Sequence, residues 1–167
     1  MNLKEELINE LEMTRKAYLH LVKSVPEEFY GHPSANPAWT IGDVLYHITL
    51  GPAAIRTEAW MIRHAGWLFS ALLNDGTAGI FNRGNALFAR HPKRITPQKL
   101  IKSYENGHSG LLTSLEGMQD ADFNKSVRYP ASFVTELAGV VTVERLFRYI
   151  KLHFEIHASQ IRVERPG

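Results

Sequence analysis

Residues 142–162 read TVERLFRYIKLHFEIHASQIR, and the periodicity of this stretch decides the fold. Apolar residues and histidines recur every three or four positions, at Leu146, Ile150, His153, His157 and Ile161. This spacing is typical of one face of an amphipathic helix. Thr142 has a side chain that caps helix N-termini well, so we expect a helix from about residue 142 to about residue 163.

Three other stretches show apolar residues at the same spacing. The first, residues 3–25, ends before a proline. The second begins at the capping residue Thr40 and extends to about residue 64, with a kink expected at Gly51-Pro52. The third begins at Thr96-Pro97, where a capping threonine precedes a proline, and runs to about residue 115. The sequence therefore predicts four long helices.

Two long connections separate these helices. Residues 74–92 contain three glycines and no clear periodicity, with a short helix expected only at residues 85–90. Residues 120–141 are interpreted as an irregular return that adds a turn of helix within residues 132–140. Four helices joined in this way predict an all-α fold, a four-helix bundle with long crossover connections. The length of 167 residues predicts a single domain, residues 1–167.

The composition excludes several classes of function. Hydrophobic residues make up 44% and charged residues 22%, as in ordinary globular proteins. Cysteine is absent, which excludes disulfides, thiolate metal sites, iron–sulfur clusters and a cysteine nucleophile. The 19 basic residues are scattered among 17 acidic ones, so nothing indicates nucleic-acid binding. The first residues resemble neither a signal nor a transit peptide, and the longest apolar stretch, residues 66–73, is too short to cross a bilayer. We therefore expect a soluble, cytoplasmic protein without a membrane partner.

His153 and His157 are the first candidate functional residues. They lie four positions apart on the apolar face of a helix, about 40° apart around its axis, so both can bind one metal ion. A histidine on such a face is also often a core residue bonded to a carbonyl group, and the spacing alone leaves this alternative open. Glu155 lies two positions from each histidine and therefore points away from them, which excludes a zincin-type protease.

His47 is the candidate third ligand. It lies at the edge of the apolar face of the second predicted helix. The alternative is a partly buried histidine that is hydrogen-bonded to Asp43, one turn earlier. For Asp43 itself we expect helix capping in preference to orienting the His47 ring.

Two motifs resemble the DinB-like (YfiT-like) proteins. Residues 37–47, PAWTIGDVLYH, resemble the start of the second helix in that family, with Asp43 in place of the more usual glutamate. Residues 149–162 are similar to its closing H-x-x-x-H motif followed by Gln-Ile. The resemblance implies a four-helix bundle, a homodimer, and a divalent metal ion held by His47, His153 and His157. Some members of the family are transferases or isomerases that depend on bacillithiol, mycothiol or a glutathione-like thiol.

Such a site predicts three alternative functions. Three imidazole ligands leave a coordination position open, and Zn²⁺ and Ni²⁺ both suit imidazole. The first hypothesis is a metal-dependent S-transferase or hydrolase, and any thiol must be an external low-molecular-weight one because the chain has no cysteine. The second is a bundle that binds a metal or small ligand without catalysis, as a sensor, a store or a stress-related protein. The third is a structural or interaction protein with histidines in its core.

The remaining histidines and aromatic residues are interpreted mainly as structural. Tyr104 and His108 face inward from the third helix, where filling the bundle is favoured over lining a pocket or moving protons. Surface or loop positions are expected for His20, His32, His64 and His91. Packing and helix-entry roles, in preference to a substrate box, are expected for Trp39, Trp60 and Trp67.

Overall fold

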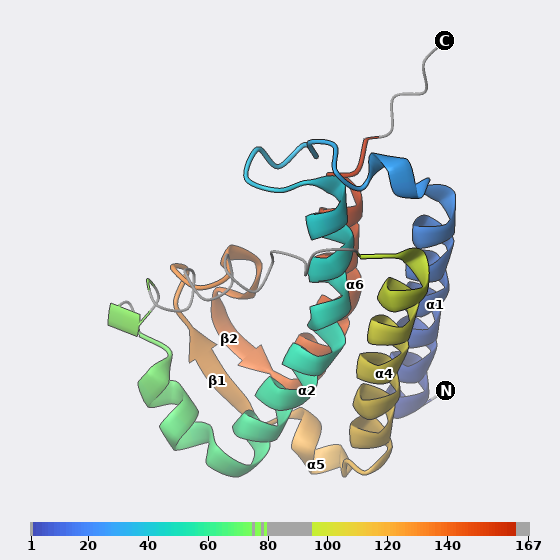
Figure 1. Ribbon diagram of the computed structural model, residues 1–167. Helices are drawn as coiled ribbons and strands as arrows, with labels where there is room; N and C mark the ends of the chain where they lie inside the picture. Colours follow the sequence, from blue (N-terminus) through green and yellow to red (C-terminus); the bar gives the residue numbers. More distant parts are fainter. Residues whose placement is uncertain (1, 75, 78, 80–94, 163–167) are drawn as a thin grey trace.

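Four long helices form a bundle in the computed structural model, which describes residues 2–74, 76, 77, 79 and 95–162. They are α1 (Leu3–Ser24), α2 (Ile41–Leu72), α4 (Pro97–Glu116) and α6 (Val143–Ala158). Helices α1 and α6 run in one direction, and α2 and α4 run in the opposite one (Figure 1). Helices α2 and α4 are therefore parallel to each other, although they follow one another in the chain. The predicted helical bundle is confirmed.

The helix starts are set by local capping residues. Thr40, Thr96 and Thr142 each accept a hydrogen bond from the backbone N–H three residues later. Thr40 and Asp43 complete a reciprocal capping box, and Pro97 occupies the first turn of α4. All three predicted starts are therefore confirmed, and so is the capping role of Asp43.

Helix α2 differs from the prediction in its length and in the position of its kink. It continues to Leu72, and its non-helical backbone lies at Ala65 (φ −139°, ψ 34°), not at Gly51-Pro52. Pro52 is buried against α4, where a Cβ atom added to Gly107 would lie 3.4 Å from the Pro52 Cβ. This close packing holds the Pro52 region within the bundle. The chain bends only after it has left α4 (Figure 1).

A small β-hairpin replaces most of the expected irregular return. After α5 (Asp120–Phe123), strand β1 (Ser126–Tyr129) pairs antiparallel with β2 (Gly139–Thr142), with Ser126 opposite Thr142 and Tyr129 opposite Gly139. Strands of four residues are too short to show a clear alternation in the sequence. The predicted turn of helix within residues 132–140 is confirmed as η2 (Thr135–Leu137). The hairpin lies beside the second half of α2 (Figure 1).

The last helix ends earlier than predicted. Helix α6 stops at Ala158 with Ser159 as its C-cap, not near residue 163.

A short helix, η1 (Glu27–Phe29), follows α1 and begins the loop that leads to α2. The short helix expected at residues 85–90 lies outside the described residues. Across the described ranges, none of the helices has the length and hydropathy that a bilayer crossing requires.

Candidate metal centre

Three histidines from two helices converge on one point. His47 lies on α2 and His153 and His157 lie on α6, and one ring nitrogen from each lies within 4.8 Å of the other two. The Nε2 atoms of His47 and His153 are 3.1 Å apart. Two nitrogens that bind one tetrahedral zinc ion at about 2.0–2.1 Å lie about 3.3 Å from each other. The spacing therefore fits two ligands of a common ion.

The three rings are held in their neutral form. Burial, followed by the influence of His157, lowers the pKa of His47 to about 4. Burial also holds the pKa of His153 well below its usual range and lowers the pKa of His157. A neutral imidazole keeps a lone pair on one ring nitrogen, which is the form that binds metal ions. At neutral pH the cluster can therefore present three nitrogen donors.

Gln160 fixes the tautomer of one of these rings. The Nδ1–H of His157 donates to Gln160 Oε1 over 3.3 Å, which leaves the lone pair on Nε2. The backbone oxygen of Gln160 accepts a hydrogen bond from the N–H of Ala35 at 2.8 Å, which ties the loop before α2 to the end of α6. A hydrogen bond of this kind orients ligating histidines in metal sites.

The alternative that pairs His47 with Asp43 is wrong. The Asp43 carboxylate accepts hydrogen bonds from the backbone N–H and the hydroxyl of Thr40, at 2.9 and 2.7 Å. Within the described part of the chain, the buried Nδ1 of His47 has no hydrogen-bond partner. His47 is only 6% exposed, and its Nε2 atom faces His153 and not Asp43.

Trp39 and Gly51 shape the space around the cluster. The Trp39 ring lies 4.7 Å from the His47 ring and 5.6 Å from the His157 ring, between centroids, so this tryptophan packs against the candidate site as well as at the helix entry. A Cβ atom on Gly51 would lie 3.1 Å from His153 Nδ1. Any larger residue at position 51 would force the His153 ring to shift.

A cavity of about 330 Å³ opens beside the three histidines. We call it the histidine cavity. Its α2 wall includes His47, Gly51, Ala54 and Glu58, and its opposite side includes the segment from Phe133 to Leu137 between the two strands. Ligands can reach the cluster only through a space of this kind, which a closed structural metal site lacks.

Glu58 is a residue of this cavity that the sequence analysis did not identify. Its Oε2 accepts a hydrogen bond from the hydroxyl of Tyr129 at 2.5 Å. Burial raises the pKa of the Glu58 carboxyl above its ordinary value. The signal was present in the sequence, because Glu58 follows His47 by three helical turns on the same face of α2.

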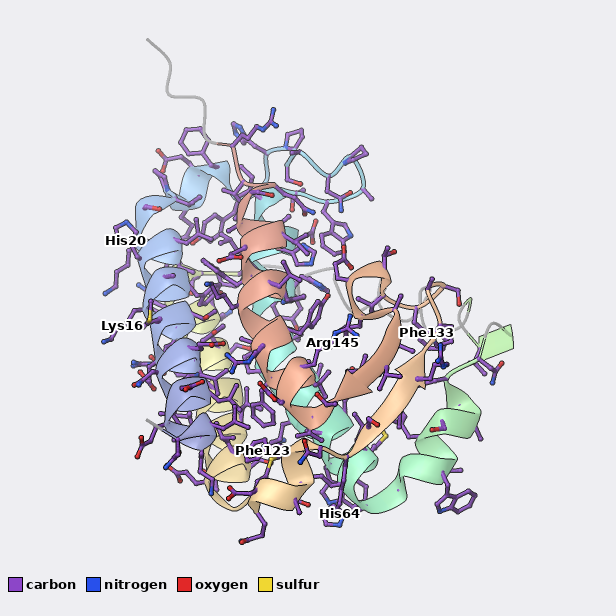
Figure 2. The ribbon with its side chains drawn as sticks, turned by 180° about the vertical axis from the view of Figure 1, so that it is seen from behind. Lys16, His20, His64, Phe123, Phe133 and Arg145 are labelled. Carbon is purple, nitrogen blue, oxygen red and sulfur yellow. The ribbon has the colours of Figure 1, made fainter. Side chains whose placement is uncertain are left out.

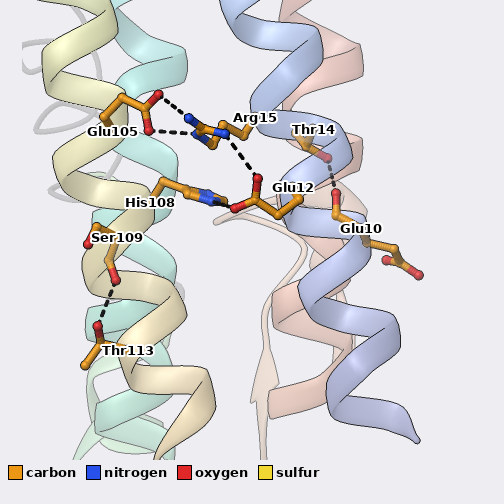
Figure 3. A network of polar contacts seen from close by, with 8 residues as sticks. All are labelled: Glu10, Glu12, Thr14, Arg15, Glu105, His108, Ser109 and Thr113. Carbon is orange, nitrogen blue, oxygen red and sulfur yellow. Dashed lines mark hydrogen bonds and ion pairs between the residues drawn. The ribbon is translucent and has the colours of Figure 1, made fainter. Parts of the chain in front are cut away.

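Tyr104 and His108 do not belong to the candidate site. His108 is 3% exposed, and its Nε2–H donates to Glu12 Oε1 on α1 at 2.8 Å (Figure 3). Glu12 also accepts from Arg15, which in turn pairs with Glu105 of α4 (Figure 3). The Tyr104 ring stacks on that of Tyr18, with centroids 4.4 Å apart. The structural interpretation of both residues is confirmed.

The other histidines and tryptophans lie away from the cluster. His20, His32 and His64 are exposed as predicted, and Figure 2 labels the first and last of them at the surface. His91 lies outside the described residues. The packing role expected for Trp60 and Trp67 is wrong, because their side chains are 56% and 80% exposed.

Comparison with known proteins identifies the fold family. The DinB superfamily profile matches residues 10–161. Two solved structures of mycothiol-dependent maleylpyruvate isomerase, one of them a point mutant, superpose with a TM-score of 0.66 at 12% sequence identity. The alignment covers 96% of this chain and 60% of that chain, so this chain spans little more than half of the isomerase. No curated protein matches the sequence. The chain belongs to the DinB superfamily.

Proposed function

We propose that this chain is a metal-dependent enzyme that binds Zn²⁺ or Ni²⁺ through His47, His153 and His157. The observation that carries the proposal is the convergence of three neutral imidazoles on the wall of an open cavity. Imidazole nitrogen is a preferred ligand of both ions. Three protein ligands leave a position for a further ligand from the cavity.

We further propose that this ligand is an external low-molecular-weight thiol. A divalent ion lowers the pKa of a coordinated thiol or water and so supplies a nucleophile near neutral pH. The chain has no cysteine, so a thiol nucleophile must enter from outside. The structurally similar isomerase depends on mycothiol, which supports a thiol-dependent transferase over a hydrolase.

The residues of the chain prepare the site for such a ligand. Burial keeps the three imidazoles deprotonated, and Gln160 holds the His157 ring in one tautomer. Trp39 covers one side of the His47 and His157 rings, which restricts the approach of water from that side. Gly51 leaves room for the His153 ring. Together these contacts preorganise the donor atoms before the ion arrives.

The structural alternative lacks support in the geometry. Core histidines normally have satisfied hydrogen bonds, as His108 does with Glu12. His47 and His153 instead point their Nε2 atoms at each other, and His47 Nδ1 has no partner among the described residues. The non-catalytic alternative, a sensor or store, shares the ligands and differs only in the absence of turnover.

A panel of thiols and electrophiles tests the enzymatic proposal. The metal-loaded protein is incubated with mycothiol, bacillithiol or glutathione and an activated alkene, and the loss of free thiol is followed by colorimetry. We expect consumption that requires the metal and is abolished in His153→Ala, with His108→Ala as the control for a buried histidine outside the cluster. A panel of esters tests the hydrolase alternative in the same way. A protein that retains the metal but turns over neither thiols nor esters would favour the sensor or store.

A further inference from the structure

One face of α2, from His47 to Glu58, forms a wall of the histidine cavity, which we call its floor. His47, Gly51, Ala54 and Glu58 follow one another at spacings of four, three and four residues, and all four line the cavity. This spacing places them on one face of the helix. Gly51 and Ala54 have little or no side chain, so the floor is low between His47 and Glu58. Positions 47 and 58 are about 16 Å apart along the axis at about 1.5 Å per residue.

Glu58 ends this floor with a half-buried carboxyl group that forms no ion pair with a described lysine or arginine. Its Oε2 atom accepts a hydrogen bond from the hydroxyl of Tyr129 at 2.5 Å, and no ion pair among the described residues includes it. A carboxyl group has two oxygens and can accept several hydrogen bonds. Burial raises its pKa, so this position costs folding free energy. Beyond its contact with Tyr129, the Glu58 carboxyl group therefore retains hydrogen-bonding capacity for a ligand.

The charges around the cavity favour a hydrogen-bond donor over an anion. The described residues that line it include two carboxyl groups, Glu58 and Glu136, and neither lysine nor arginine. Arg145 lies nearby but is engaged elsewhere, because its guanidinium donates to the backbone oxygens of Glu136 and Val140 at 3.0 and 2.7 Å. Figure 2 shows Arg145 between α6 and the hairpin. A ligand carboxylate would meet like charge here, which disfavours its binding.

Building on the proposed function, we propose that Glu58 is a specificity-determining residue that binds the remote end of the thiol held at the histidines. The group that it recognises is a hydrogen-bond donor, a hydroxyl or an amine, and a terminal carboxylate is rejected. The ligand is accordingly an elongated thiol whose sulfur lies at the three histidines and whose donor group lies along α2, over Gly51 and Ala54. Tyr129 is a positioning residue that orients the Glu58 carboxyl.

A series of ω-substituted alkanethiols tests this assignment without any need for catalysis. The thiols end in an amine, a hydroxyl, a methyl or a carboxylate, and their chains extend to about twelve carbons, which covers the roughly 16 Å between the two helix positions. The protein is loaded with Co²⁺, and binding is followed through the cobalt–thiolate absorption. Glu58→Gln and Glu58→Met are the test variants. Glu136→Gln, at the exposed side of the same cavity, is the matched control.

We expect thiols of sufficient length that end in an amine or a hydroxyl to bind about tenfold or more tightly than the methyl-terminated thiols, and the carboxylates to bind more weakly. An amine preference should disappear in both Glu58 variants, because neither carries a negative charge. A hydroxyl preference should survive in Glu58→Gln, which retains an acceptor, and disappear in Glu58→Met. Both preferences should persist in Glu136→Gln.

Equal affinities for all end groups in the wild type, or a preference that persists in Glu58→Met, would overturn the assignment of Glu58 while leaving the metal site intact. The absence of a cobalt–thiolate band with every thiol is a different result. It would overturn the thiol proposal itself, and the role of Glu58 with it.

Discussion

The Nε2 atoms of His47 and His153 lie 3.1 Å apart although 106 residues separate the two histidines in the chain. Two neutral imidazoles can share only one hydrogen bond across such a contact, and the third ring, His157, lies beside both with centroids 4.5 and 4.6 Å away. His47 is buried and the other two rings are half-buried, and bringing such polar rings together is costly unless a ligand satisfies them. This cost supports the proposal that the cluster binds a cation.

Gly51 provides the first test of the geometry. In Gly51→Ala the added methyl group would lie 3.1 Å from His153 Nδ1, so the ring must shift. We expect metal affinity to fall about tenfold or more, while the free energy of unfolding stays constant or rises by up to about 1 kcal/mol because alanine favours the helix. Isothermal titration with Zn²⁺ and chemical unfolding measure the two quantities.

Gly66→Ala is the matched control for this substitution. It lies on the same helix, and a Cβ atom there would meet nothing within 4 Å. The control should bind metal as the wild type does. An unchanged metal affinity in Gly51→Ala would mean that the position of the His153 ring is not important for the site.

Gln160 provides a test of tautomer control. In Gln160→Leu the Nδ1–H of His157 loses its acceptor, so the ring is free to rotate and to change its tautomer. Metal affinity should fall roughly 10–100-fold, as is usual when the partner of a ligating histidine is removed. Gln160→Glu retains an acceptor and should bind nearly as the wild type does. Equal weakening in both variants would assign the effect to the end of α6 and not to this hydrogen bond.

The folding cost of Glu58 is expected to depend on pH. Its pKa is raised by burial above the ordinary value of 4.5, so the folded state binds the proton more tightly than the unfolded state does. The stability that this carboxyl contributes is complete below about pH 4.5 and is lost as the pH rises toward its folded pKa. Glu58→Gln should therefore raise the free energy of unfolding by on the order of 1 kcal/mol at neutral pH, which corresponds to a Tm increase of about 2–4 °C. At pH 4 the substitution should change the stability little.

Thermal unfolding of the two proteins at pH 4 and pH 7.5 measures this difference. A Glu58→Gln protein that is less stable than the wild type at both values would show that the carboxyl has a structural role. That result would remove the argument that Glu58 is retained for a ligand.

Asp122 has the opposite pH dependence. Its carboxylate accepts hydrogen bonds from Lys125 and Arg63, both at 2.9 Å, and from the Gln119 backbone N–H at 3.1 Å. The Lys125 contact first, and then the Gln119 and Arg63 contacts, hold its pKa well below the usual 3.8. Its stabilising contribution is present above about pH 3.8 and is lost as the pH falls through the folded value.

Asp122→Asn should accordingly lower the free energy of unfolding by about 1–3 kcal/mol at neutral pH, because hydrogen bonds to a charged group are replaced by hydrogen bonds to a neutral one. Urea unfolding at pH 7 and pH 3 measures the difference, which should shrink at the lower value. Metal affinity is expected to stay unchanged, because Asp122 is not part of the histidine cavity. An equal loss of stability at both pH values would show that the negative charge of Asp122 does not cause the stabilisation.

The sequence predicted the features that depend on local signals. Thr40, Thr96 and Thr142 are capping residues whose effect extends over three residues, and each starts its helix where expected. The helical backbone at Pro52 was not predictable, because it depends on packing against α4, which no local signal in the sequence reveals. The four-residue strands of the hairpin were too short to show a period.

The candidate site was predicted in part. Helical spacing alone paired His153 with His157, whereas His47 joined them through the resemblance to a family, since periodicity contains no information about contacts across 106 residues. Glu58 was missed because a glutamate on a helix is usually a solvated residue. Its hydrogen-bond partner is Tyr129 of the hairpin, an element that the sequence did not reveal.

Metal analysis of His47→Ala, His153→Ala and His157→Ala beside the wild type tests the central claim most directly. The proteins are purified, stripped with a chelator, titrated with Zn²⁺ and analysed for bound metal, with His108→Ala as the buried-histidine control. We predict about one tightly bound ion per chain in the wild type and in His108→Ala, and a loss of tight binding in the three cluster variants. Equal metal content in all five proteins, or a wild type that binds none, would contradict the claim that these histidines form a metal site.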